Sequence, residues 1–202
     1  EAARGQEFNA WSSGNPPEHE TILPFTRLLG GPMDYTPGIF QIHVNQFDPN
    51  KKEQVHTTVA KQLALYVTLY SPLQMAADLP ENYEKRLDVF QFIKDVPVDW
   101  SDTKILEASI GDYITTARRQ KGTQNWFIGS ITDENARDVS VKLNFLQAGK
   151  VYEATIYEDG AGADWEKNPY PVNIRKITVR KGQTIPLKLA AGGGCAISLT
   201  TK

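Results

Sequence analysis

Asn-Trp-Phe-Ile-Gly-Ser-Ile, residues 125–131, is the stretch that decides the fold. Aromatic and β-branched residues dominate it, and the turn residues Gly122 and Asp133 bound it on either side. A short run of this kind between turn signals is typical of a β-strand. Because Trp126 lies inside the run, we expect its side chain in the core and not on a sugar-binding surface.

The same pattern recurs through the C-terminal half of the chain, where short β runs alternate with turn signals such as Gly111-Asp112 and Lys181-Gly182. The predicted strands are residues 105–110, 113–118, 125–131, 138–143, 151–157, 174–179, 184–189 and 196–200. Strands at this spacing predict an all-β unit, an antiparallel β-sandwich over residues 101–202.

Residues 1–100 follow a different, α/β pattern. We expect a helix that starts near Glu18 and Glu20, both as helix-start residues and not ligands, and that ends at Gly30-Gly31. Next comes a short buried strand over residues 32–40. An amphipathic helix should follow from Val55, capped by Thr57 or Thr58, and a further helix should cover residues 80–94.

This order of elements predicts the C-terminal portion of a catalytic TIM barrel over residues 1–100, joined to the β-sandwich over residues 101–202. Asp34 would lie at the carboxyl end of its strand, where barrels bind substrates. The alternative for Asp34, a turn aspartate that caps its own backbone, stays equally open. His43 and His56 are isolated and are expected to be structural.

Composition excludes several classes of partner. The chain has 202 residues and a net charge of -2, with lysines and arginines scattered along it, so we expect neither nucleic-acid nor membrane binding. It contains no run of about eighteen apolar residues. The single cysteine, Cys195, has no partner for a disulfide and is expected to be a small buried residue.

The first eleven residues are dense in reactive side chains, with Glu1 and Glu7 six positions apart and Arg4 and Gly5 between them. Two interpretations stay open on composition alone. The stretch is either a functional loop at the rim of an active site or a frayed, solvated terminus.

Residues 101–202 show no catalytic constellation. Asp159, Asp164 and Glu166 flank a glycine-rich turn, but their spacing does not fit an EF-hand, and we expect a solvated loop. Trp165 and Tyr170 are candidates for exposed aromatic side chains that could contact a sugar.

Several motifs follow one another in a specific order: Glu-Ala-Ala-Arg-Gly-Gln-Glu at 1–7, Asn-Pro-Pro-Glu-His at 15–19, Leu-Pro-Phe-Thr-Arg at 23–27, Gly-Pro-Met-Asp-Tyr-Thr-Pro-Gly at 31–38, the helix start Val-His-Thr-Thr at 55–58, and Asn-Trp-Phe-Ile-Gly at 125–129. This order resembles the C-terminal portion of glycoside hydrolase family 97, a family of α-glucosidases and α-galactosidases. The resemblance covers essentially the whole chain.

The resemblance implies a protein of three parts: an N-terminal β-super-sandwich, a catalytic TIM barrel and a C-terminal β domain. Only the end of the barrel and the C-terminal domain would lie in this chain. The implied partners are an oligosaccharide or α-glycoside substrate and the missing N-terminal and barrel segments of the same protein. The implied location is periplasmic or otherwise exported.

For the site, the resemblance implies that Glu7 is the general acid that protonates the departing glycosidic oxygen. It implies calcium as the cofactor, with Glu1 and Glu7 as the carboxylates of this chain at the metal. The opposing base or nucleophile and the other calcium ligands lie upstream in the family. We therefore expect hydrolysis of α-glucosides or α-galactosides by the longer protein, and no activity from this chain alone.

A second hypothesis assigns the chain to a different class. Residues 101–202 would be a noncatalytic carbohydrate-binding or oligomerisation module, with Trp165 and Tyr170 as its exposed aromatic side chains.

Overall fold

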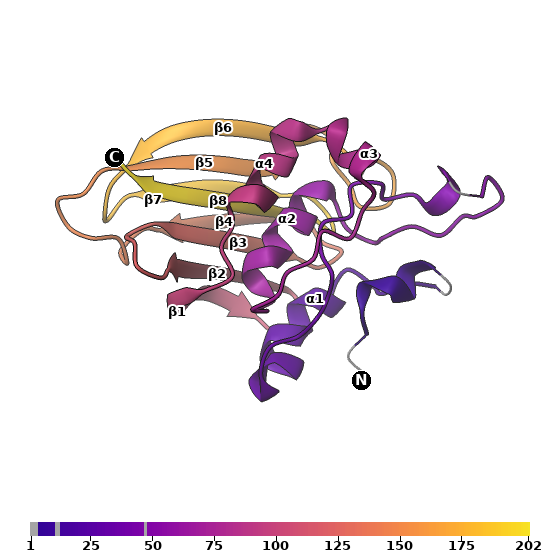
Figure 1. Cartoon of the computed structure of the whole chain (residues 1–202), viewed down its shortest axis with the longest axis horizontal. Helices are drawn as coiled ribbons and strands as arrows, with labels where there is room; N and C mark the ends of the chain where they lie inside the picture. The colour runs from indigo at the N-terminus through magenta and orange to yellow at the C-terminus, as the bar shows by residue number, and fades with distance from the viewer. Residues whose placement is uncertain (1–3, 11–12, 47) are drawn as a thin grey trace.

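A computed structural model describes residues 4–10, 13–46 and 48–202 of the chain. Helices and turns come first in the sequence and strands follow (Figure 1). The helical elements are η1 (Gln6–Ala10), α1 (His19–Ile22), η2 (Leu23–Phe25), η3 (Arg27–Gly30), η4 (Val44–Gln46), α2 (Val59–Thr68), α3 (Pro80–Glu84) and α4 (Leu87–Asp95). The strands are β1 (Trp100–Ser109), β2 (Tyr113–Gln120), β3 (Trp126–Thr132), β4 (Arg137–Lys142), β5 (Tyr152–Asp159), β6 (Val172–Val179), β7 (Thr184–Leu189) and β8 (Gly194–Thr201).

All eight predicted strands form, and every strand pair is antiparallel. Six of them make one sheet in the order β1-β2-β3-β8-β5-β6, and β4 and β7 make a second sheet. One face of the larger sheet packs on the smaller one through side chains such as Ile128, Val141, Leu187 and Ile197. The antiparallel β-sandwich is therefore confirmed.

The other face of the six-stranded sheet is covered by α2 and α4, which lie in front of it in Figure 1. Leu63 and Val67 of α2 and Phe92 of α4 share a core with Phe127 and Ile131 of β3. Strand β3 is thus buried along its whole length, with its two faces in two different cores. Residues 125–131 thus lie in the central layer of the molecule, between the two cores.

The barrel half of the predicted fold class is not present in the structure of this chain. Among the described residues, no strand precedes Trp100 and no parallel pair occurs. The strand expected over residues 32–40 does not form: these residues have no regular secondary structure and belong to no ladder. Pro32 and Pro37 lack donors for one, and Thr36 has a φ of 61° that breaks the extended run.

Side chains take the place of that ladder. The backbone amides of Gly38 and Ile39 donate to Gln62 Oε1 at 3.0 and 3.1 Å. The amides of the next two residues, Phe40 and Gln41, donate to Asp78 Oδ2 at 2.7 and 2.6 Å. The strand prediction was wrong because these backbone donors are satisfied by side chains that are distant in sequence.

The helix predictions held in part. Helix α2 is capped as predicted, with Thr58 Oγ1 accepting from the backbone amide of Lys61 at 3.2 Å. It is not amphipathic, however, because all ten of its residues are buried. The helix expected from Glu18 ends early at Ile22 and continues as 3-10 turns. The one expected over residues 80–94 divides into α3 and α4.

Helix α2 lies unusually close to the sheet, and glycines make this possible. A Cβ on Gly129 of β3 would lie 2.5 Å from the backbone oxygen of Ala64. A Cβ on Gly194 of β8 would lie 2.8 Å from Lys61 Cα. Backbone thus packs against backbone, and any side chain at these two positions must push the helix away.

We expect Gly129→Ala to lower the free energy of unfolding by about 1–3 kcal/mol, because the added methyl group overpacks the contact with Ala64. Urea denaturation followed by circular dichroism measures this. Gly30→Ala is the matched control, since a Cβ at Gly30 meets nothing within 4 Å. Equal stability of the two variants would contradict the close packing of α2 on β3.

A buried carboxylate lies beside the start of α2. Asp159, the last residue of β5, accepts through Oδ2 from the amides of Ala190 and Gly194 at 2.8 and 2.9 Å. Its Oδ1 is buried without a hydrogen-bond partner. Burial raises the pKa of Asp159 from 3.8 to about 6, against the lowering effects of the Thr58 side chain, of the Ala190 and Gly194 amides and of Lys61.

The raised pKa makes stability depend on pH. The folded state keeps the proton of Asp159 up to about pH 6, whereas the unfolded state releases it near 3.8. The contribution of Asp159 to the free energy of unfolding therefore falls as pH rises from about 4 to about 6, by on the order of 3 kcal/mol. Asp159→Asn should remove this fall, measured as urea midpoints at successive pH values. The exposed Asp138→Asn variant should keep the wild-type slope.

Candidate functional site

The N-terminal segment is fixed in place by buried polar side chains. Gln6 and Asn9 are buried, and Asn9 Nδ2 donates to the backbone oxygen of Gln6 at 2.9 Å. Asn15 donates from its backbone amide to Asn9 Oδ1 at 2.8 Å and from Nδ2 to the oxygen of Gly5 at 3.0 Å. The frayed-terminus interpretation is therefore wrong for residues 4–10. Glu1 lies outside the described residues.

A pair of buried glutamines ties this segment to α2. Gln6 Nε2 donates to Gln62 Oε1 at 3.0 Å, and Gln62 Nε2 donates back to Gln6 Oε1 at 3.1 Å. Gln6 Nε2 also donates to the oxygen of Thr36 at 2.9 Å. Both amide groups are shielded from water, so the position of η1 is set by α2 and by the loop before Gly38.

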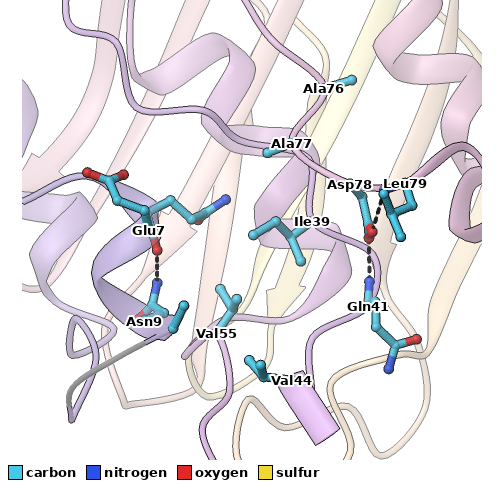
Figure 2. Close-up of a pocket in the computed structure, with 12 residues that line it drawn as sticks. Glu7, Asn9, Ile39, Gln41, Val44, Val55, Ala76, Ala77, Asp78 and Leu79 are labelled. Carbon is cyan, nitrogen blue, oxygen red and sulfur yellow. Dashed lines mark hydrogen bonds between the residues drawn. The ribbon is translucent and has the colours of Figure 1, made fainter. Parts of the chain in front are cut away.

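Glu7 follows Gln6 directly and faces the opposite way. Its side chain is exposed and lies at the edge of a cavity of about 500 Å³. Figure 2 shows the carboxylate pointing away from Ile39 and Val55, the apolar residues at the centre of the cavity. It folds back over Gly5, where a Cβ would come within 2.2 Å of Oε2. A rigid backbone thus presents a solvent-accessible carboxyl group.

The cavity beside Glu7 is mainly apolar, and its other carboxylate is already engaged. Its apolar lining comes from Ile39, Val44, Val55, Ala76, Ala77 and Leu79. Asp78 Oδ1 accepts from the amide of Leu79 at 2.7 Å and from Asn82 Nδ2 at 2.6 Å, in addition to the two amides on its Oδ2. Figure 2 shows the bonds from Leu79 and Gln41. Glu7 is thus the carboxyl group of this lining that is available to a ligand.

A second cluster of charged groups lies inside the protein. Lys61 Nζ is 3.2 Å from Glu20 Oε2, and both side chains are buried. The ammonium also donates to the oxygens of Pro17 and Thr132 at 2.7 and 3.0 Å. Tyr35 donates its hydroxyl to Glu20 Oε1, and burial together with the charge of Glu20 holds the pKa of Tyr35 well above 10.0. These groups are closed to solvent, and Glu20 Oε2 has the ion pair with Lys61 but no hydrogen bond.

The calcium site expected from the sequence is not formed by the described residues alone. No group of three or more His, Cys, Asp or Glu side chains converges within residues 4–10, 13–46 and 48–202. Calcium requires about six to eight oxygen ligands, and Glu7 supplies one carboxylate. The predicted ligand Glu1 falls outside the described part of the chain.

The aromatic residues expected to be exposed are half-buried instead. Trp165 packs edge-on against His56 with ring centroids 4.8 Å apart, and Tyr170 lies against His43 at 5.6 Å. Both histidines are thus structural, as expected. Trp126 is in the core as predicted. The expected exposure of the two rings is therefore wrong: Trp165 is partly covered by the loop between η4 and α2, and Tyr170 by His43 just before η4. The carbohydrate-binding hypothesis itself stays a prediction.

Asp159 does not lie in the solvated loop that the sequence predicts: it ends β5, and its carboxylate is buried because it accepts from the amides of Ala190 and Gly194. Asp164 accepts from the amides of Glu166 and Lys167 at 2.9 Å each, a local turn in a largely exposed loop. Cys195 is buried, and Asp34 is exposed. No helix in the described ranges has the length and apolar character needed to cross a membrane.

Sequence reasoning missed Gln6, Gln62 and Lys61, although one signal was present. Within α2 only Lys61, Gln62 and Thr68 are polar, so the helix is apolar almost all round. A helix of that kind is buried, and its polar residues then need buried partners.

Comparison with known proteins places this geometry in context. A retaining α-galactosidase of Bacteroides thetaiotaomicron is 34% identical over 208 residues, which cover 98% of this chain and 30% of that protein. A glycoside hydrolase family 97 enzyme from Pseudoalteromonas sp. strain K8, solved in complexes with panose and with acarbose, is 50% identical with a TM-score of 0.93, covering 98% of this chain and 31% of that one. A β-arabinopyranosidase structure shares the fold at 22% identity, with a TM-score of 0.74 over 90% of this chain and 27% of that one.

The chain therefore spans about a third of the length of these relatives. Residues 99–200, which contain nearly all of the eight strands, match the family model described as the C-terminal, oligomerisation domain of glycosyl hydrolase family 97. This chain belongs to glycoside hydrolase family 97 and corresponds to the C-terminal portion of the proteins in that family.

Proposed function

We propose that this chain is the C-terminal part of an enzyme that hydrolyses α-glycosidic bonds in α-glucosides or α-galactosides, and that Glu7 is its general acid. The main observation that supports this proposal is the exposed carboxyl group of Glu7 at the rim of a cavity. Buried hydrogen bonds hold the backbone that carries it in place. The α-galactosidase among the relatives supports the class of reaction.

The chemistry requires a group of this kind. Cleavage of a glycosidic bond needs a carboxyl group that protonates the departing oxygen and a second carboxylate on the other side of the sugar. In this proposal Glu7 serves the first role, and the second carboxylate comes from the preceding barrel segment. Residues 4–98 would pack against that barrel and bring Glu7 to its substrate.

Calcium belongs to the same proposal as a cofactor at the rim of the site, where it would neutralise carboxylates and orient the substrate. Glu7 and Glu1 would contribute to its ligand set, and the other oxygens would come from the preceding segment. We assign no step of the reaction to the ion. An exported, periplasmic location is likewise part of the proposal.

Glu7→Gln in the full-length enzyme should reduce kcat/KM on substrates with poor leaving groups by about 10²–10⁴-fold, because glutamine cannot supply the proton. Aryl glycosides whose leaving group departs without a proton should lose far less. Rates on a series of aryl and alkyl glycosides measure this. The exposed Glu84→Gln variant on α3 is the control and should match wild type. Equal losses on every leaving group would refute the acid role.

We also propose that the β-sandwich mediates self-association, in line with the description of the matching family model. Of the matched residues, the two exposed large hydrophobic side chains are Ile105 and Ile110, which are 51% and 64% exposed. Both lie on or directly after β1, an edge strand whose outer backbone groups are free to pair.

Replacement of both Ile105 and Ile110 by glutamate should shift the full-length protein toward monomer in sedimentation velocity, because the charges would oppose burial of this edge. Lys188→Glu, on an exposed position of β7, is the control and should leave the sedimentation profile unchanged. An unchanged oligomer in the double variant would exclude β1 as the interface.

A further inference from the structure

We infer that Gln62, in the middle of α2, is a positioning residue that sets the place of Glu7 at the cavity. The inference rests on the proposed acid role of Glu7. Gln62 has no contact with the cavity and would act only through the backbone that carries Glu7.

Gln62 joins three separate segments through a single amide group. Its Oε1 accepts from Gln6 Nε2 and from the backbone amides of Gly38 and Ile39, at 3.0 to 3.1 Å. Its Nε2 donates to Gln6 Oε1 at 3.1 Å and to Thr57 Oγ1 at 2.8 Å. The side chain is fully buried. Every hydrogen-bonding position of the amide is therefore used.

Two of these segments, those of Gln6 and of Gly38, form walls of the cavity. Gln6 directly precedes Glu7, and Gly38 directly precedes Ile39, which lines the cavity opposite (Figure 2). Neither wall is held by a β-ladder, since no strand precedes Trp100 in the described chain. Two links therefore connect Glu7 to the facing wall: the direct hydrogen bond from Gln6 Nε2 to the oxygen of Thr36, and the Gln62 amide on a helix that is itself packed against the sheet.

Loss of the Gln62 amide should displace the segments around Gln6 and Gly38, and not only lower the stability of the protein. Without Gln62, the amides of Gly38 and Ile39 and both polar atoms of the Gln6 side chain lose partners in a dry environment. Buried donors without partners are costly, so the segments must shift to find water. A displacement of about 1 Å at a reacting group can cost about 10²-fold in rate.

The test uses Gln62→Leu and Gln62→Glu in the full-length enzyme. Leucine removes all five hydrogen bonds, whereas glutamate keeps the acceptor for Gly38 and Ile39 and loses the donor to Gln6 and Thr57. We expect kcat/KM on poor leaving groups to fall by about 10–100-fold for leucine, with a smaller fall for glutamate. Good aryl leaving groups should lose much less, and KM should change little.

A matched control separates positioning from general loss of stability. Thr115 and Ser130 form another fully buried polar pair, with their hydroxyl oxygens 2.8 Å apart, inside the large sheet and outside the cavity lining. Thr115→Val should destabilise the protein without changing how the rate depends on the leaving group. If Thr115→Val and Gln62→Leu, compared at equal folded fraction, alter that dependence equally, the inference is overturned.

The double variant Glu7→Gln/Gln62→Leu decides whether Gln62 acts through Glu7. If it does, Gln62→Leu should cause almost no further loss on poor leaving groups once Glu7 is replaced. A full additional loss would refute the positioning role while leaving the acid role intact. If Glu7→Gln itself shows no dependence on the leaving group, the proposed function fails first, and this result is distinct from the failure of Gln62→Leu alone.

Discussion

The close packing of α2 on β3 and β8 is the constraint on which the rest of the structure depends. Glycines at 129 and 194 let the helix backbone touch the sheet, and helix and strands together close one of the two cores. A helix that is buried on all sides cannot leave its polar residues to water. Lys61 and Gln62 therefore need hydrogen-bond partners inside the protein. The segments that carry these partners are held next to α2 by the same hydrogen bonds.

This requirement orders a region that has little regular structure of its own. The Lys61 ammonium pairs with Glu20 and donates to the oxygens of Pro17 and Thr132. The Gln62 amide forms hydrogen bonds with Gln6 and with the loop at Gly38. A buried ion pair adds little net stability, because desolvation of both charges offsets their attraction. Its effect here is on geometry, since the ammonium holds Glu20, Pro17 and Thr132 at hydrogen-bonding distance from one point of α2. The N-terminal segment is thereby tied to α2 by hydrogen bonds of buried side chains.

The parts of the fold that could be predicted are those specified by neighbouring residues. Turn signals between short apolar runs predict all eight strands, and the threonines before α2 predict its cap as Thr57 or Thr58, of which the structure shows Thr58. The segment at 32–41 could not be predicted, because its backbone donors are satisfied by Gln62 and Asp78. Likewise, the exposure of Trp165 was misjudged because its partner His56 lies far away in sequence. For the candidate site, Glu7 could be named from the sequence, but the buried glutamines Gln6 and Gln62 that position its backbone could not.

The same contacts leave Glu7 as the one carboxyl group of the described cavity lining that is not already held by hydrogen bonds. Asp78 shares the cavity, but both of its oxygens are occupied by four N–H donors. Glu20 is buried between Lys61 and Tyr35 and faces neither solvent nor the cavity lining. Glycoside hydrolysis needs carboxyl groups on both sides of the sugar. In the proposed site the work would be divided: buried hydrogen bonds of this chain would hold the carboxyl group of Glu7 in position, and the opposing carboxylate would come from outside the described residues.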